Sequence, residues 1–192
     1  MSGALISWYS QLSEVKQHLI TKDPKLAQVF ETVDKGGFQL HTVIKQPYPA
    51  LIGAIIGQKI TYTAAKSLRG ELYTRYGTEF IPTTLYRQDL SFLGPVVSTI
   101  IYDVTEYIMN YNVNLNTEEG IRSLMSVKGI GTWTIETTLI TTFKNWNLFP
   151  IGDKFLEKRI IRLYGPGCDT KLISNQWAPY RSLVTWYLWR WF

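Results

Sequence analysis

The chain has 192 residues, 45% of them hydrophobic, and a formal net charge of +5 at pH 7, which favours a polyanionic partner. Its length is enough to bury a core without covalent cross-links, and its one cysteine, Cys168, excludes an intrachain disulfide and a zinc or iron-sulfur site built from several cysteines. No apolar run approaches the roughly 18 residues that cross a bilayer, and the chain does not begin with a secretion signal, so we expect an intracellular protein that is not bound to a membrane.

The apolar spacing predicts helices nearly throughout the chain. They are expected around Leu12 to Leu19, from Pro24 to Val33, Pro49 to Gly57, about 61 to Gly77, Thr84 to Leu90, Pro95 to about Tyr111, Asn116 to near Ser126, about Thr132 to Phe143, about Lys154 to Tyr164, and about Pro179 to the C-terminus. Asp23 is the expected N-cap of the second helix, and Asn116 with Glu119 has the spacing of a capping box. Residues 38–47 predict a loop or a marginal extended segment. The pattern indicates a single all-α domain of roughly ten helices.

One segment, from Ser126 to Thr134, stands out because it contains Gly129-Ile130-Gly131 just before a predicted helix. Such a turn lets the backbone approach a ligand, and the N–H groups at the helix N-terminus attract an anion such as a DNA phosphate. A tight turn between two helices, with glycine at the C-cap position, explains the same residues equally well when the segment is taken alone.

Together with other segments, this turn resembles the landmarks of the helix-hairpin-helix DNA glycosylases, in particular the 3-methyladenine DNA glycosylase II branch. The matching runs, in chain order, are Asp23 to Ala27, Ala54 to Thr61, Val127 to Thr134, Phe149 to Asp153, and Trp177 to Ser182 with Trp189. The resemblance covers most of the chain and implies an active site in the groove between two helical lobes. One lobe comprises about residues 50–150, including the hairpin at 126–134, and the other comprises about residues 1–48 and 151–192.

The resemblance implies that the chain hydrolyses the bond between a damaged base and deoxyribose after the nucleotide has been flipped out of the duplex. An alkylated purine carries positive charge and leaves readily, and a nearby carboxylate stabilises the oxocarbenium-like transition state or orients the attacking water. Asp153 stands at the position of the family's catalytic aspartate. The run Gly152-Asp153-Lys154 also predicts an N-cap for the following helix, and both roles are compatible.

Trp133 bears on the reaction type. In lyase-active relatives a lysine at this place attacks C1′ and forms a Schiff base, which an indole cannot do. The resemblance therefore implies a monofunctional glycosylase that leaves the abasic site uncut and needs no cofactor.

The base pocket implied by the resemblance includes Trp133 and Trp189, with Tyr187 as a weaker candidate, because aromatic rings stack on an electron-poor base. Core packing is the alternative for each ring. Thr137 stands where a relative has an aromatic pocket residue, which leaves the substrate range open.

Residues for DNA binding are also implied. Gln58, Lys59 and Ile60 match the loop that fills the space left by the flipped base, and either Lys59 or Ile60 is the expected wedge. The hairpin residues expected to contact DNA are Lys128, Gly129, Ile130, Gly131, Thr132 and Thr134. A monovalent cation at the hairpin backbone, residues 126–131, is a further hypothesis, and no other metal is expected. Lys66, Arg69 and Lys154 are additional candidates for contacts with phosphates.

The expected partner is double-stranded DNA that contains a damaged base, and the expected state is a monomer located wherever DNA resides. Three alternatives stay open from the residues: a non-catalytic DNA-binding module, a lyase-coupled glycosylase for oxidised bases, and a helical scaffold without a nucleic-acid role. The sequence does not rank 3-methyladenine against 7-methylguanine, ethenoadenine, hypoxanthine or deaminated bases.

Overall fold

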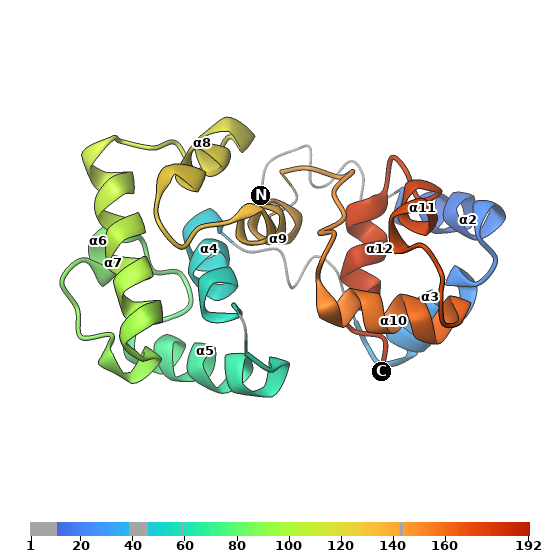
Figure 1. Cartoon of the computed structure of the whole chain (residues 1–192), viewed down its shortest axis with the longest axis horizontal. Helices are drawn as coiled ribbons and strands as arrows, with labels where there is room; N and C mark the ends of the chain where they lie inside the picture. Colours follow the sequence, from blue (N-terminus) through green and yellow to red (C-terminus); the bar gives the residue numbers. More distant parts are fainter. Residues whose placement is uncertain (1–10, 39–45, 59, 143) are drawn as a thin grey trace. The chain divides into compact units, whose positions relative to one another are not determined.

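The computed structural model of the chain describes residues 11–38, 46–58, 60–142 and 144–192, and every regular element within these ranges is helical (Figure 1). The α-helices are α2 (Leu12–Lys22), α3 (Leu26–Lys35), α4 (Pro47–Ile56), α5 (Tyr62–Tyr76), α6 (Pro82–Leu85), α7 (Pro95–Asn110), α8 (Glu118–Ser123), α9 (Thr132–Thr141), α10 (Lys154–Tyr164), α11 (Thr170–Asn175) and α12 (Arg181–Leu188). Two short 3₁₀ helices, η2 (Ser91–Leu93) and η3 (Leu124–Ser126), complete the set. The expected all-α class is confirmed, and no helix of the described part is long and apolar enough to cross a membrane.

One predicted helix start is wrong and another is shifted. Thr117, not Asn116, caps α8, because its hydroxyl accepts the backbone N–H of Gly120 at 3.1 Å. Asp23 closes α2 and α3 begins at Leu26, two residues later than expected, but Oδ1 of Asp23 accepts the Lys25 N–H at 3.3 Å as an N-cap side chain would. Its other oxygen takes part in a buried network described below. The helix α11 was not predicted, since its six residues are too few to show a periodic apolar face. Most of the segment 38–47 lies outside the described residues.

The chain divides into two compact units, which are described separately. Both ends of the chain, up to residue 44 and from residue 145, form the first unit, and residues 45–144 form the second. The first unit thus contains α2, α3 and α10 to α12, and the second contains α4 to α9.

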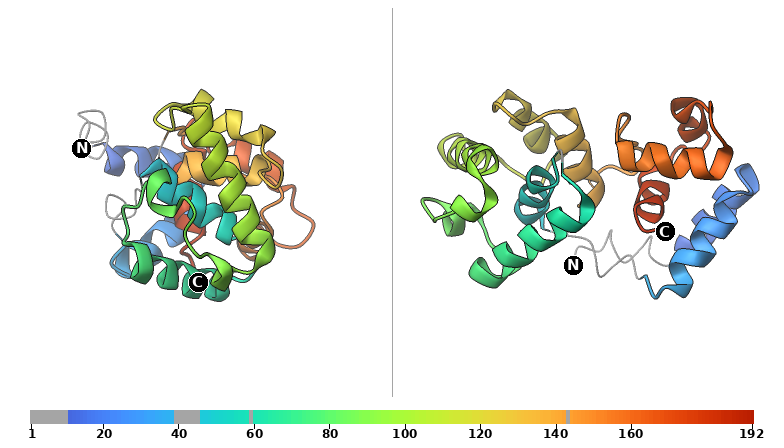
Figure 2. Two further views of the ribbon diagram at one scale, coloured as in Figure 1. Left: turned by 90° about the vertical axis from the view of Figure 1, so that its left-hand side faces the viewer. Right: turned by 60° about the horizontal axis from the view of Figure 1, so that its bottom comes forward.

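The second unit is organised around α4. Every residue of this helix except Pro47 and Gly53 is buried, as expected for a helix that is apolar on all sides. Helix α9 packs along α4, and α5 and α7 also contact it (Figures 1 and 2). Burial of one large aliphatic side chain contributes about 1.5–3 kcal/mol, so α4 is the main source of stability in this unit. Its position fixes Gly57 and Gln58, which follow it directly.

The first unit is organised around α12, in which all residues from Ser182 to Leu188 are buried. Helices α3 and α10 both contact it. A buried polar network joins distant parts of the same unit: the Asp23 carboxylate accepts hydrogen bonds from the Trp177 indole N–H at 2.8 Å and from the Tyr164 hydroxyl. This network ties the end of α2 to α10 and to the segment that precedes α12.

Candidate functional site

The hairpin of the second unit runs from η3 to the first turn of α9. Gly129 has a φ of +90°, and a Cβ at this position would lie 2.7 Å from the Ile100 side chain of α7. Both the backbone conformation and the lack of space therefore require glycine. The Ile130 N–H donates to the Val127 carbonyl at 3.1 Å and closes the turn.

Gln58, in the loop after α4, braces this hairpin. Its side-chain amide donates to the Gly129 carbonyl at 3.0 Å and to the Thr134 hydroxyl at 2.9 Å. Because one amide group holds both sides of the turn, the Gly-Ile-Gly backbone is fixed before any ligand arrives. Gln58 was predicted to contact DNA, whereas the structure uses its amide inside the protein.

The other predicted DNA contacts divide by exposure. Lys128, Gly129, Gly131 and Thr132 are exposed, and Gly131 is the N-cap of α9, so the N–H groups of the first helical turn point out of the helix end. Ile130 and Thr134 are only 5% and 2% exposed. Their side chains are used inside the protein: Ile130 packs into the core, and Thr134 accepts the Gln58 hydrogen bond.

The predicted wedge residues follow Gln58 in the chain. Ile60 is 41% exposed, so its side chain reaches the surface of the second unit. Lys59 lies outside the described residues.

Asp153 lies at the start of α10 in the first unit and is 8% exposed. One carboxylate oxygen, Oδ1, accepts the backbone N–H groups of Phe155 at 2.9 Å and Leu156 at 3.1 Å, so Asp153 is the N-cap of α10. The other oxygen, Oδ2, accepts the indole N–H of Trp189 at 3.3 Å. Three N–H donors at the start of α10 and at its indole neighbour thus fix the orientation of the carboxylate.

A cavity of about 210 Å³ opens beside this carboxylate within the first unit. It is lined by Phe149, Pro150, Ile151, Gly152, Asp153, Lys154, Glu157 and Thr170. Its two other charged groups, Lys154 and Glu157, form an ion pair of 2.8 Å with each other. The cavity thus places the Asp153 carboxylate beside a lysine and a glutamate that pair with each other.

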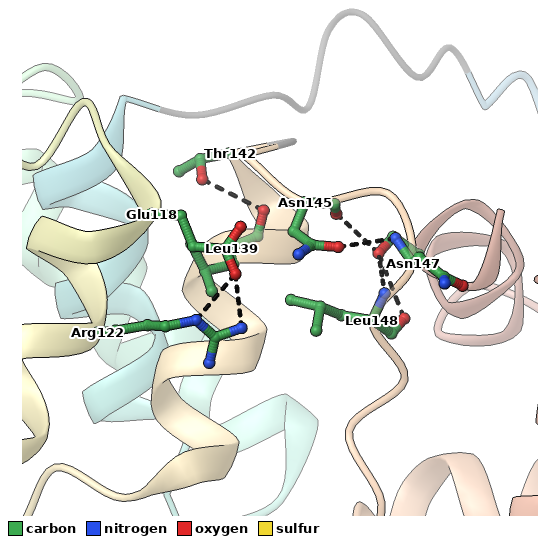
Figure 3. Close-up of polar contacts among 8 residues, drawn as sticks. Glu118, Arg122, Leu139, Thr142, Asn145, Asn147 and Leu148 are labelled. Carbon is green, nitrogen blue, oxygen red and sulfur yellow. Dashed lines mark hydrogen bonds and ion pairs between the residues drawn. The ribbon is translucent and has the colours of Figure 1, made fainter. Parts of the chain in front are cut away.

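The segment that leads to Asp153 is anchored on α12. The Ser182 hydroxyl accepts the Leu148 N–H at 3.0 Å and donates to the Asn145 carbonyl at 2.9 Å. Asn147 N–H in turn donates to the Asn145 side chain at 2.8 Å (Figure 3). Since Trp189 follows α12 directly, the same helix positions both the loop before Asp153 and the indole that contacts it.

The three predicted pocket rings have different surroundings. Trp189 is half-buried, with the Trp186 ring edge-on at 5.8 Å. Tyr187 is 1% exposed, its ring packs edge-on against Phe30 at 4.8 Å, and its hydroxyl donates to Asp34 at 3.0 Å. This environment leaves almost no ring surface for a base, so Tyr187 is a core residue and the prediction of a pocket role is corrected.

Trp133 is half-buried on α9, and its indole lies against Gly57: a Cβ at that position would be 3.5 Å from the ring atom Cη2. One turn later, the Thr137 hydroxyl oxygen is enclosed without a hydrogen-bond partner among the described residues. The Gln58 brace and the Trp189–Asp153 hydrogen bond were missed at the level of sequence, because each joins residues far apart in the chain and neither follows from a local pattern.

Comparison with known proteins gives a consistent set of relatives. No family model matches the chain. It is 25% identical over 201 residues to the alkylbase DNA glycosidase-like protein mag2 of Schizosaccharomyces pombe, with 94% of each chain covered. It is 27% identical over 165 residues to DNA-3-methyladenine glycosylase 1 of the same yeast, with 76% of this chain and 72% of the relative covered.

Among solved structures, the fold is similar to that of the S. pombe 3-methyladenine DNA glycosylase Mag1 in complex with abasic DNA. The TM-score is 0.70 at 21% identity, with 92% of this chain and 95% of the other covered. The all-helical fold and the relatives together place the chain in the helix-hairpin-helix DNA glycosylase superfamily.

Proposed function

We propose that the chain is a monofunctional DNA glycosylase that hydrolyses the N-glycosidic bond of alkylated purines in double-stranded DNA and acts as a monomer. The observation that carries this proposal is that the two oxygens of the Asp153 carboxylate have different contacts. Oδ1 caps α10, Oδ2 accepts the indole N–H of Trp189, and the carboxylate lines a cavity. The relatives named as alkylbase or 3-methyladenine glycosylases support the choice of substrate class.

In the proposed reaction, the bond between the purine nitrogen and C1′ breaks, and its electron pair goes to the departing base. A purine alkylated at N3 or N7 carries a positive charge, so it leaves as a neutral molecule. Water supplies a hydroxyl group to C1′ and releases one proton. The Asp153 carboxylate stabilises the positive charge that develops at C1′ and orients the water. The products are the free base and an abasic site.

DNA binding is assigned to the second unit. Backbone N–H groups at Gly131 and the start of α9 bind a phosphate, and Lys128 adds a positive charge beside them. A wedge at Ile60 or Lys59, stacking by Trp133 and Trp189, and a monovalent cation at residues 126–131 are parts of the same proposal. Because an indole occupies position 133, no amine is available there for a Schiff base, and the reaction ends at hydrolysis.

The test is Asp153→Asn, which keeps the oxygen that caps α10 and removes the charge. On a duplex with 7-methylguanine or 3-methyladenine, base release at saturating enzyme should fall by about 100-fold or more, while binding to the same duplex persists. Asp169→Asn is a matched control, because Asp169 caps α11 through N–H groups at 2.9 Å from Lys171 and Leu172 in the same manner. Absence of base release by the unmodified chain from every alkylated duplex would leave a DNA-binding module and overturn the proposal.

Borohydride treatment during the reaction separates the proposal from a lyase mechanism. A Schiff base would be reduced to a permanent link between protein and DNA, and we expect none to form. A trapped adduct would assign the chain to the lyase-coupled branch.

A further inference from the structure

Helix α10 carries a stripe of side chains that the proposed reaction does not use. Phe155, Arg159 and Arg162 follow one another at positions i, i+4 and i+7, so they share one face of the helix. The Arg159 guanidinium lies over the Phe155 ring at 4.5 Å and over the Phe192 ring at 4.9 Å. The Arg162 guanidinium lies over the Trp191 ring at 4.7 Å. We call these five residues the arginine stripe; the end of the chain lies beside α10 (Figure 1).

The two arginines of the stripe differ from Arg75 and Arg122 in the absence of a carboxylate at ion-pair distance among the described residues. Arg75 pairs with Glu71, one turn earlier, at 2.5 Å. Arg122 pairs in the same way with Glu118 at 2.6 Å (Figure 3). In the part of the chain that the structure describes, no carboxylate lies at ion-pair distance from Arg159 or Arg162. The stripe thus holds two positive charges one helical turn apart, neither of them in an ion pair with a described carboxylate.

These charges are held at an electrostatic cost. The Nε atom of Arg159 is buried and has no hydrogen-bond partner among the described residues. Burial, and then repulsion by the Arg162 guanidinium, lower the pKa of Arg159. An anion that accepts hydrogen bonds from both guanidinium groups would remove the repulsion and satisfy their outward N–H donors.

The aromatic rings indicate which anion fits. They contact the guanidinium groups without accepting hydrogen bonds from the fork of N–H donors, which matches a planar or tetrahedral oxyanion. Phe192 is 65% exposed, so its ring also offers a face on which a base can stack. Positive charges beside an exposed aromatic ring are typical of a surface that binds nucleic acid, because phosphates contact the charges and bases stack on the ring. The carboxylates of an acidic peptide would contact the charges alone.

We infer that the arginine stripe is a second DNA-binding surface, which contacts backbone phosphates through Arg159 and Arg162, separately from the hairpin of the second unit. The inference extends the proposed function, because it assumes that DNA is the partner of the chain. It assigns the stripe to affinity and not to the chemistry at C1′, since neither arginine lines the cavity beside Asp153.

The experiment measures binding of an undamaged DNA duplex to the full chain as a function of salt concentration. Each phosphate contact contributes about 0.9 to the slope of log K against log salt. The double variant Arg159→Gln/Arg162→Gln should therefore lower the magnitude of the slope by roughly 2 and weaken binding by on the order of tenfold at moderate salt. Arg159→Lys/Arg162→Lys should restore the slope, because the charges return, with weaker binding than the unmodified chain.

The matched control is Arg75→Gln/Arg122→Gln, which removes the same charge from two arginines that already have acidic partners. An equal decrease of the slope in both glutamine variants would mean that the net charge alone explains the effect, and this would overturn the inference. An unchanged slope in the stripe variant would also overturn it. Loss of binding to an oligo-glutamate probe in the stripe variant, with the DNA slope kept, would assign the stripe to an acidic protein. Thermal unfolding of each variant reports whether it is folded.

Base release by the unmodified chain is measured separately on an alkylated duplex. If the unmodified chain releases no base but the stripe variant has a smaller salt slope, the second DNA-binding surface is supported and the proposed activity is overturned. If the unmodified chain releases base but the stripe variant has an unchanged slope, the proposed activity is supported and the second DNA-binding surface is overturned.

Discussion

The indole N–H of Trp189 donates to Oδ2 of Asp153 at 3.3 Å, while Oδ1 of the same carboxylate accepts two backbone N–H groups of α10. The carboxylate is therefore held at both oxygens, by the backbone at Oδ1 and by a side chain at Oδ2. Trp189 was expected only as a stacking surface, but its polar edge has a role of its own: it orients the proposed catalytic group.

Trp189→Phe separates the two roles of this residue, because phenylalanine keeps an aromatic face and lacks the N–H. A hydrogen bond to a charged group is worth about 1.5–3 kcal/mol, so we expect base release at saturating enzyme to slow by at least about tenfold. Binding to abasic DNA should change little. Replacement of Trp189 by benzothienylalanine, which has sulfur in place of N–H in a ring of the same shape, is the sharper version, and a normal rate in that protein would rule out the orienting role.

Gln58→Leu removes the brace of the hairpin at nearly constant side-chain volume. The Gly129 carbonyl and the Thr134 hydroxyl then lose their common donor, which should lower the free energy of unfolding by roughly 1–3 kcal/mol. Because the brace also fixes the backbone that meets DNA, duplex affinity should fall as well. Chemical denaturation and fluorescence anisotropy measure the two effects.

Gln58→Glu is the companion variant, since its carboxylate has the same reach but cannot donate to the Gly129 carbonyl. We expect it to weaken both properties as much as leucine does. Full affinity in either variant would mean that the hairpin holds its conformation without the brace.

Gly129→Ala tests the closest contact of the hairpin. Alanine would adopt a φ of +90° and place its Cβ 2.7 Å from Ile100, so the turn or α7 must shift. We expect a loss of roughly 1–3 kcal/mol in unfolding free energy, together with weaker DNA binding. Gly131→Ala is the matched control two residues later: its φ is −108°, and no atom lies within 4 Å of an added Cβ. Similar losses in both variants would contradict the steric explanation.

Much of the fold could be predicted from the sequence because helical spacing and glycine or proline breaks are local signals. Asp153 as an N-cap is one such case, visible in the three residues around it. Capping of α8 by Thr117 was missed since two adjacent residues, Asn116 and Thr117, both suit the position. Choosing between them requires the backbone angles, which the sequence pattern does not contain.

The candidate site was less predictable, for reasons of packing. Helix α12 is buried on all sides, so no periodic pattern distinguishes Tyr187, a core residue, from Trp189 just beyond the helix. Likewise, the order of polar and apolar residues along the hairpin does not reveal that the side chains of Ile130 and Thr134 are buried. The Gln58 brace joins residues 71 and 76 positions apart, and such a contact depends on how α4 packs against α9.

Because of Tyr164, the stability of the first unit should decrease as the pH rises through the alkaline range. Burial, followed by the hydrogen bond to Asp23 and the charge of that carboxylate, raises the pKa of Tyr164 above its ordinary value near 10. Above about pH 10 the tyrosine ionises in the unfolded chain while it remains protonated in the folded one. Its contribution to the free energy of unfolding is therefore fully present below that pH and declines as the pH rises further.

Tyr164→Phe should accordingly be less stable than the unmodified chain at pH 8, by about 1 kcal/mol for the lost hydrogen bond to Asp23. The difference between the two proteins should narrow between about pH 10 and pH 11, because only the unmodified chain loses this contribution. Urea denaturation at a series of pH values measures it, with Tyr111→Phe, at a ring 69% exposed, as the reference for a surface tyrosine. A difference that stays constant over this range would show that the Tyr164 hydroxyl ionises as readily in the folded chain as in the unfolded one.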